Sequence, residues 1–198
     1  GHNIYWYGII IAAGFLLAVA YGLWRAPRFS MDPDVITDAI FVVMPSAIIG
    51  ARLYYVIFNP AVCFDADRTF SLYRMIAFWD GGLAIYGGVI ATVISALIFC
   101  KVRKVDFWSG MDITVYGLLI GQMVGRWGNF VNVEAYGSVT GLPWRMCSES
   151  IANELWRKGL LESQEMYQSM LDGTLGVHPT FFYESMWNLL GFILLLML

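Results

Sequence analysis

"IYWYGIIIAAGFLLAVAYGLW", residues 4–24, contains no charged side chain. A helix needs about 20 mostly apolar residues to cross roughly 30 Å of hydrocarbon, and this run is long enough. A second uncharged run, "GGLAIYGGVIATVISALIFC", occupies residues 81–100. The two runs together predict a helical protein that spans a membrane.

Three further apolar runs have similar lengths but contain some polar side chains. They are Val35–Phe58, Phe107–Gly125 and Thr180–Leu198. Because backbone polar groups inside a bilayer must be satisfied within the segment, each run is expected to be a helix. The sequence therefore predicts an all-α fold, a polytopic transmembrane helical bundle with about five spans.

The composition agrees with a membrane protein and argues against a nucleic-acid partner. Hydrophobic residues make up 59% of the 198 residues, and charged residues only 14%. Soluble domains have about 45–50% apolar and about 25% charged residues. A chain of this size cannot bury so much apolar surface in one aqueous core. The net charge of −3 is small, and nucleic-acid binding would need a clustered basic surface.

Basic side chains in two short loops predict the orientation in the membrane. They are Arg25, Arg28, Lys101, Arg103 and Lys104. Short loops rich in lysine and arginine stay in the cytoplasm. The N-terminus is therefore predicted to lie outside, with Leu198 toward the cytoplasm.

Residues 137–177 are too polar to cross a membrane. Ile151, Leu155 and Leu160 recur at loosely helical spacing, which predicts one amphipathic helix lying on the outer face. We interpret residues 1–198 as a single membrane-embedded domain, with residues 137–177 as an extramembrane arm.

Four charged residues fall in or beside the apolar runs: Arg52, Asp112, Arg126 and Glu184. A charge at the bilayer centre costs at least about 2.5 kcal/mol on insertion scales. One explanation is structural, in which an arginine pairs with Asp112 or Glu184 and holds two helices together. The other is a polar cavity that binds a charged headgroup. The cost of burial alone does not separate the two.

The stretch "GRWGNFVNVEAYG", residues 125–137, favours the second explanation. Gln122, Arg126 and Asn129 lie at positions i, i+4 and i+7 and share one helix face. Their guanidinium and amide groups can bind phosphate oxygens. Gly125 and Gly128 leave room beside this face for a ligand or another helix.

Residues 125–137 also carry a long family signature, Gly-Arg-x-Gly-Asn-Phe-x-Asn-x-Glu-x-x-Gly. It is met by Gly125, Arg126, Gly128, Asn129, Phe130, Asn132, Glu134 and Gly137. The stretch resembles the signature of the bacterial prolipoprotein diacylglyceryl transferases. Four other segments resemble the same family in order and spacing: "WYG" at 6–8, "GARLYYVIF" at 50–58, "WDGGLAIYGG" at 79–88 and "HPTFFYE" at 178–184.

The resemblance implies an enzyme of the bacterial inner membrane. It would transfer the diacylglyceryl group of phosphatidylglycerol to the lipobox cysteine thiol of a prolipoprotein and release glycerol phosphate. The implied partners are phosphatidylglycerol, the lipobox segment and the lipid bilayer. No cofactor is implied. The chain has no metal-ligand spacing of histidine or cysteine, so no metal is expected.

The resemblance also implies the residues of the site. The expected catalytic residues are Arg126, Asn129, Glu134 and Tyr86, and phosphatidylglycerol would contact Arg126, Tyr7, Gly81, Gly82, Asn132 and Gly137. Without the resemblance, an interfacial role explains Tyr7 equally well, and contact between helices explains the glycines. The nucleophile belongs to the substrate, so none of Cys63, Cys100 and Cys147 is expected to react.

Two features depart from the family pattern. Some members carry histidine where this chain has Tyr86, and a tyrosine with a pKa near 10 is a poorer base. Tyr86, Glu134 and a residue outside this chain are the alternatives for the base. Members also have a further C-terminal span with an arginine and an acidic residue. This chain lacks an initiator methionine and stops within the apolar run 191–198, which predicts truncation.

Two other functions remain as hypotheses. Arg126 and Asp112 could line the path of a transporter or channel. Transporters commonly contain paired internal repeats, but the sequence has no second copy of residues 125–137. The chain could also be a non-catalytic, lipid-binding subunit. Transfer of lipid to a thiol peptide separates the enzyme from both.

Overall fold

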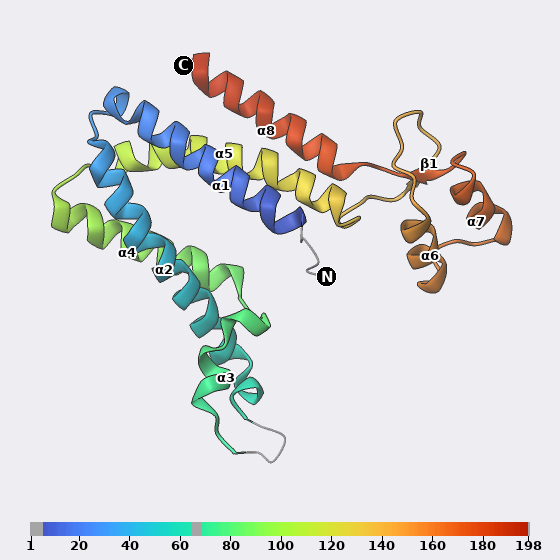
Figure 1. The fold of residues 1–198 in the computed structure, drawn as a ribbon, viewed down its shortest axis with the longest axis horizontal. Coiled ribbons are helices and arrows are strands. Elements are labelled where there is room, and N and C mark those ends of the chain that lie inside the picture. The colour runs from blue at the N-terminus through green and yellow to red at the C-terminus, as the bar shows by residue number, and fades with distance from the viewer. Residues whose placement is uncertain (1–5, 65–68, 198) are drawn as a thin grey trace. The chain divides into compact units, whose positions relative to one another are not determined.

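The structure is a computed structural model that describes residues 6–64 and 69–197. Its helices are α1 (Trp6–Arg25), α2 (Pro33–Phe58), α3 (Leu72–Ile76), α4 (Ile85–Arg103), α5 (Phe107–Val131), α6 (Glu149–Arg157), α7 (Gln164–Leu171) and α8 (Thr180–Met197) (Figure 1). Short 3₁₀ turns are η1 (Ala26–Phe29), η2 (Pro60–Cys63) and η3 (Phe78–Asp80), and the strands are β1 (Val139–Thr140) and β2 (Gly176–Val177). The predicted all-α, polytopic fold is confirmed.

Among the described residues, four helical segments are long and apolar enough to cross a membrane. They are Trp6–Phe29, Pro33–Phe58, Ile85–Arg103 and Thr180–Met197. The other predicted span is helix α5, which has 25 residues. It is long enough to cross but less apolar, because Asp112, Gln122 and Arg126 lie within it. Apolar side chains face outward on these helices, as Phe41 and Trp187 do at 75% exposure each.

The contacts divide the chain into two compact units. One comprises Gly1–Tyr21 and Thr114–Leu198, and the other comprises Gly22–Ile113. The first unit therefore holds most of α1 and α5 together with α8 and the arm. The second holds α2, α3 and α4.

In the unit Gly22–Ile113, helices α2 and α4 pack closely where two glycines meet. A Cβ atom on Gly87 would lie 2.4 Å from the carbonyl oxygen of Gly50 and 2.3 Å from Cβ of Tyr54. Small residues at a crossing let two helix backbones approach, which is how helices associate in a lipid environment. An ion pair between Arg103 and Asp38, 2.8 Å long, also joins the two helices.

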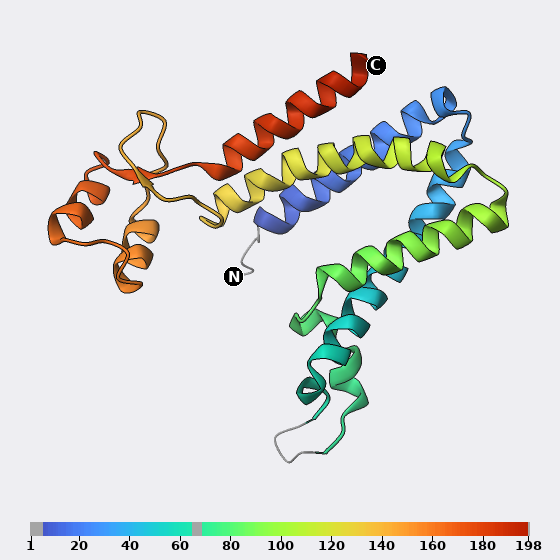
Figure 2. The same ribbon diagram turned by 180° about the vertical axis from the view of Figure 1, so that it is seen from behind.

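In the other unit, helix α5 packs against both α1 and α8 (Figure 2). A Cβ atom on Gly14 of α1 would lie 3.2 Å from Val124 of α5. Between α5 and α8, the indole nitrogen of Trp127 donates to Oγ of Ser185 at 3.1 Å. The same hydroxyl donates to the carbonyl oxygen of Met123 at 3.0 Å, so the fully buried Ser185 hydroxyl has a partner both as a donor and as an acceptor.

The arm contains two short helices where the sequence predicted one. Ser148 caps α6 by accepting the N–H of Ser150 at 3.2 Å, and Ser163 caps α7 by accepting that of Met166 at 3.2 Å. Gly159, at φ +66°, ends the first helix in a left-handed conformation. The prediction of a single helix was wrong because these caps and Gly159 divide an otherwise continuous amphipathic pattern.

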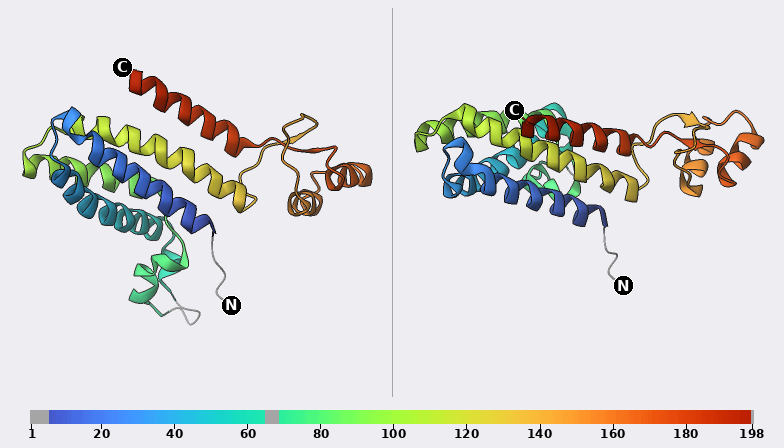
Figure 3. Two further views of the ribbon diagram at one scale, coloured as in Figure 1. Left: turned by 45° about the horizontal axis from the view of Figure 1, so that its top comes forward. Right: turned by 90° about the horizontal axis from the view of Figure 1, so that it is seen from above.

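A small apolar core holds the arm together. Its most buried members are Ile151, Ala152, Met170 and Val177. Strands β1 and β2 pair antiparallel, with Val139 opposite Val177. Both views of Figure 3 show the arm beyond the ends of α5 and α8. The polar chain of residues 137–177 therefore has its own folded core.

Candidate functional site

Helix α5 places Arg126 one turn from Gln122 and one turn from Asn129, as predicted. Arg126 forms an ion pair with Glu184 of α8, so the pairing considered for the sequence exists. The two side chains remain 34% and 46% exposed. A guanidinium has five N–H donors, which one carboxylate cannot fully use, so Arg126 retains the capacity to bind an anion.

The chain immediately after α5 has an unusual backbone. Val133 and Ala135 have φ angles of +57° and +51°, the left-handed region that non-glycine residues rarely adopt. Between them, the N–H of Glu134 donates to the carbonyl oxygen of Asn129 at 2.9 Å. The amide of Asn132 donates to the Glu134 carboxylate at 3.4 Å. Strained residues of this kind concentrate at functional sites, so the geometry favours a functional role for Glu134.

The structure brings Tyr7 of α1 against the same helix. A Cβ atom on Gly128 would lie 2.9 Å from Cδ2 of Tyr7, so the ring occupies the space that any larger residue at 128 would fill. Tyr7, a residue of the predicted site, and Gly128 of the signature are far apart in the sequence and are therefore neighbours only through the fold. Gly128 is needed for this contact and not only for helix packing.

We expect Gly128→Ala to lower the free energy of unfolding by about 1–3 kcal/mol, because its methyl group overlaps the Tyr7 ring. Gly121→Ala on the same helix is the matched control, since a Cβ there meets nothing within 4 Å. Alanine also favours a helix over glycine, so the control is expected to be neutral or stabilising. Unfolding by heat in detergent micelles measures both, and equal stability of the two variants would contradict the contact.

Gly137, the last residue of the signature, packs against the residues at the start of α8. Its N–H donates to the carbonyl oxygen of His178 at 2.9 Å. A Cβ atom there would lie 2.8 Å from Cβ of His178 and 3.1 Å from Cγ2 of Thr180. The hydroxyl of Thr180 donates to the carbonyl oxygen of Ala135. Close packing thus accounts for this glycine, while its contact with a lipid stays a prediction.

A cavity of about 340 Å³ lies in the unit Gly22–Ile113, and one of about 550 Å³ lies beside the end of the signature. The larger cavity is lined by Val133, Glu134, Ala135, Tyr136, Gly137, Ser138, Val139, Glu154, Leu155, Lys158 and Leu160. Sequence reasoning missed the polar network on its wall. The Tyr136 hydroxyl donates to Glu154 at 2.6 Å, and Lys158 pairs with the same carboxylate at 2.5 Å. The spacing of Glu154 and Lys158, four residues apart, could have indicated their ion pair from the sequence.

This network shifts the pKa values of two of its members. Burial, reinforced by the hydrogen bond to Glu154 and by its negative charge, raises the pKa of Tyr136 to about 12. The hydrogen bonds from Lys158 and then Tyr136 lower the pKa of Glu154 below its ordinary value of 4.5. Glu154 is therefore ionised at neutral pH, and Tyr136 stays protonated.

These shifts predict a loss of arm stability in acid. The folded-state pKa of Glu154 is depressed, so its contribution is fully present above pH 4.5 and is lost as the pH falls through the lower, folded-state value. Amide hydrogen exchange of α6 is expected to accelerate as the pH falls below 4.5, after correction for intrinsic rates. Glu154→Gln should flatten this response, whereas Glu165→Gln, an exposed change in α7, should leave it intact. An unchanged response in Glu154→Gln would refute the assignment.

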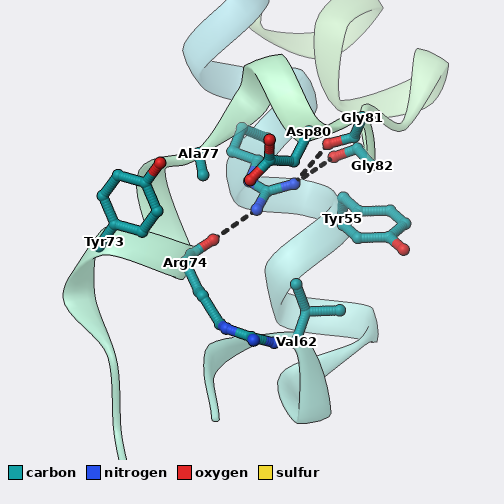
Figure 4. A pocket seen from close by; sticks show the side chains of 9 residues that line it. Tyr55, Val62, Tyr73, Arg74, Ala77, Asp80, Gly81 and Gly82 are labelled. Atoms are coloured by element: carbon teal, nitrogen blue, oxygen red, sulfur yellow. Dashed lines mark hydrogen bonds between the residues drawn. The ribbon is translucent and has the colours of Figure 1, made fainter. Parts of the chain in front are cut away.

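The remaining predicted site residues lie in the unit Gly22–Ile113. Gly81 and Gly82 have φ angles of +88° and +72°, and Tyr86, in the first turn of α4, is 70% exposed. The carbonyl oxygens of both glycines accept hydrogen bonds from Arg52 (Figure 4). Arg52 therefore binds backbone carbonyls, whereas the sequence had suggested a carboxylate as its partner.

The two units thus hold separate parts of the predicted site. Tyr7, Arg126, Asn129, Asn132, Glu134 and Gly137 belong to one unit, and Gly81, Gly82 and Tyr86 belong to the other. The long apolar helices define a multi-pass membrane protein, and a partly exposed ion pair and a strained polar segment lie at the end of α5.

The chain belongs to the prolipoprotein diacylglyceryl transferase family, whose sequence model matches residues 1–198. It is 41% identical over 197 residues to a phosphatidylglycerol–prolipoprotein diacylglyceryl transferase of Oceanobacillus iheyensis, covering 99% of this chain and 63% of that protein. Proteins of the same name from Listeria welshimeri and Trichormus variabilis are 38% and 39% identical over 196 residues, covering 99% of this chain and 65% and 63% of those proteins. The chain thus spans less than two thirds of the length of these relatives.

Proposed function

We propose that the protein transfers the diacylglyceryl group of phosphatidylglycerol to the lipobox cysteine thiol of prolipoproteins and releases glycerol phosphate. The observation that carries this proposal is the family signature, with Arg126 partly exposed in α5 and Glu134 held in a strained segment after it. The name shared by the relatives agrees with it.

The proposed reaction is a displacement at the glyceryl carbon. The substrate thiol loses its proton to a base, and the thiolate forms a new C–S bond. The C–O bond to phosphate breaks, and its electron pair leaves with the phosphate oxygen as glycerol phosphate. Arg126 and Asn129 would stabilise the charge that develops on that oxygen, which is electrostatic catalysis. Glu134, Tyr86 and a residue outside this chain are the candidates for the base.

The other predicted residues would bind the lipid headgroup. The amide of Asn132 and the hydroxyl of Tyr7 can donate hydrogen bonds to phosphate or glycerol oxygens. Gly81, Gly82 and Gly137 carry no side chains that would obstruct the headgroup. The close approach of Tyr7 to Gly128 supports including Tyr7, because it places a phenol beside the helix that carries Arg126.

We also propose the cellular setting. Residues 1–198 would form part of one domain in the bacterial cytoplasmic membrane, with the N-terminus outside and Leu198 toward the cytoplasm. The basic residues after α1 and at the end of α4 support this orientation. The outward-facing apolar side chains support a location in the membrane. The arm, residues 137–177, would then lie at the outer face, where a secreted prolipoprotein is available.

Purified full-length protein in detergent tests the proposal, with phosphatidylglycerol and a synthetic lipobox peptide as substrates. We expect equal amounts of glycerol phosphate and thioether-linked peptide, measured by mass spectrometry. A peptide with serine in place of cysteine should release no glycerol phosphate, and Asn129→Ala should slow both products together. Release of glycerol phosphate without a lipidated peptide would indicate a hydrolase that frees diacylglycerol from the phospholipid, and absence of both products would exclude the transferase.

A further inference from the structure

Arg52 of α2 is buried, at 7% exposure, and donates hydrogen bonds to carbonyl groups in two later segments of the chain. Its Nε donates to Met75 at 3.0 Å, and Nη2 donates to Arg74 at 2.5 Å, both near the end of α3. Its Nη1 donates to Gly81 at 2.7 Å and to Gly82 at 3.0 Å. Figure 4 shows the carbonyl groups of Arg74, Gly81 and Gly82 directed to one point on the wall of the cavity of about 340 Å³. One guanidinium therefore holds α3 and the turn formed by Gly81 and Gly82, the glycine turn, to α2.

The glycine turn packs closely on Arg52 and Tyr55 at its second glycine. Both of its glycines have positive φ angles. A Cβ atom on Gly82 would lie 2.7 Å from Nη1 of Arg52 and 2.5 Å from the ring of Tyr55. That ring also lies against the guanidinium, with the Arg52 Cζ atom 5.6 Å from its centroid. The turn therefore follows the surface formed by Arg52 and Tyr55.

The turn also sets where α4 begins. The N–H of Ala84 donates to the carbonyl oxygen of Ala51, 3.1 Å away, and α4 starts at Ile85. Tyr86 lies in that first turn. Tyr86 follows Gly82 by four residues, so we expect a change in the conformation of the turn to shift it.

We infer that Arg52 is a positioning residue, which holds the Gly81–Gly82 turn and the first turn of α4 in the conformation that receives the lipid headgroup. The inference rests on the proposed function, in which Gly81, Gly82 and Tyr86 belong to the site. Lysine cannot replace Arg52, because its donors radiate from a single nitrogen, whereas the four carbonyls require the planar fork of a guanidinium.

The test compares Arg52→Ala and Arg52→Lys with Arg103→Gln in the full-length protein. Arg103 is the matched control, because it is an arginine that joins α2 and α4 through a carboxylate and does not contact the turn. For both Arg52 variants we expect kcat to fall about 10–100-fold, as misplacement remote from the chemistry commonly does. The KM for phosphatidylglycerol should rise while that for the peptide stays constant. A smaller folded fraction would lower the apparent kcat alone.

Two further measurements do not depend on a comparison of activities alone. In both Arg52 variants, hydrogen exchange is expected to accelerate in residues 74–86 and to stay unchanged in α5. In Arg103→Gln it is expected to stay unchanged in both segments. Guanidinium chloride at low millimolar concentration should restore both slow exchange and turnover in Arg52→Ala. Ethylammonium chloride should not, because it lacks the planar fork.

The outcomes separate this inference from the proposed function. An active wild type whose Arg52 variants keep normal kcat and KM overturns the positioning role. Unchanged exchange in residues 74–86 overturns it as well, even where activity falls. If the wild type itself lacks transferase activity, the proposed function fails, and the exchange and guanidinium experiments still decide whether Arg52 orders the turn.

Discussion

Replacement of Arg126 by alanine is expected to lower the turnover of diacylglyceryl transfer by about 10²–10³-fold, the loss typical of one donor to a developing oxyanion. Arg126→Lys keeps the positive charge but loses the bidentate fork, so it should retain more activity than alanine. The KM for the lipobox peptide should change little, since the peptide does not carry the phosphate. Steady-state release of glycerol phosphate measures these effects.

Glu184→Gln is the control that separates catalysis from helix pairing. It removes the ion pair with Arg126 and leaves the guanidinium in place. Because the two side chains are 34% and 46% exposed, the ion pair itself should contribute about 1 kcal/mol or less to stability. We expect Glu184→Gln to cost less than about 10-fold in turnover, far less than Arg126→Ala. Equal losses in the two variants would show that Arg126 acts only by joining α5 to α8.

Gly87→Ala is expected to produce the largest loss of stability, about 3 kcal/mol, which is the upper end of the range for overpacked sites. The added methyl group would lie 2.4 Å from the carbonyl oxygen of Gly50 and 2.3 Å from Cβ of Tyr54. These atoms belong to the backbone or sit next to it, so they cannot move away as the end of a flexible side chain could. The two helices must separate instead.

Gly88→Ala, one residue further along α4, provides the matched control. A Cβ atom there would lie 3.5 Å from the carbonyl oxygen of Ala47 and from Cβ of Ala51, which is ordinary contact. Alanine has a better helix propensity, so this variant should be neutral or slightly stabilising. Unfolding in mixed micelles titrated with SDS compares the two. Similar midpoints for Gly87→Ala and Gly88→Ala would show that α2 and α4 do not approach as closely as the structure indicates.

The positions of the long helices could be predicted because an apolar run of about 20 residues is a local property. Their ends were less predictable. The span predicted to begin at Gly81 begins as helix α4 at Ile85, since Gly81 and Gly82 adopt positive φ angles. Helix α5 continues from the predicted end at Gly125 to Val131. Polar side chains limit hydrophobic insertion but do not break a helix, so Arg126 and Asn129 remain helical.

The candidate site could be predicted only in part, for a related reason. Gln122, Arg126 and Asn129 share a face because helical spacing relates residues that are close in the sequence. The contact of Tyr7 with Gly128 joins residues that are far apart in the chain, and nothing local indicates it. The same holds for the hydrogen bond from Tyr136 to Glu154, which forms only once the arm has folded.

The sequence by itself determined the all-α class, the membrane-spanning helices, the polar face around Arg126 and the family. These follow from composition, local periodicity and a contiguous signature. Only the tertiary structure decided which partners the arginines take, so that Arg126 pairs with Glu184 and Arg52 binds the carbonyls of the Gly81–Gly82 turn. The physical reason is that an ion pair or a hydrogen bond acts over a few ångströms, and helix packing decides which distant residues come that close.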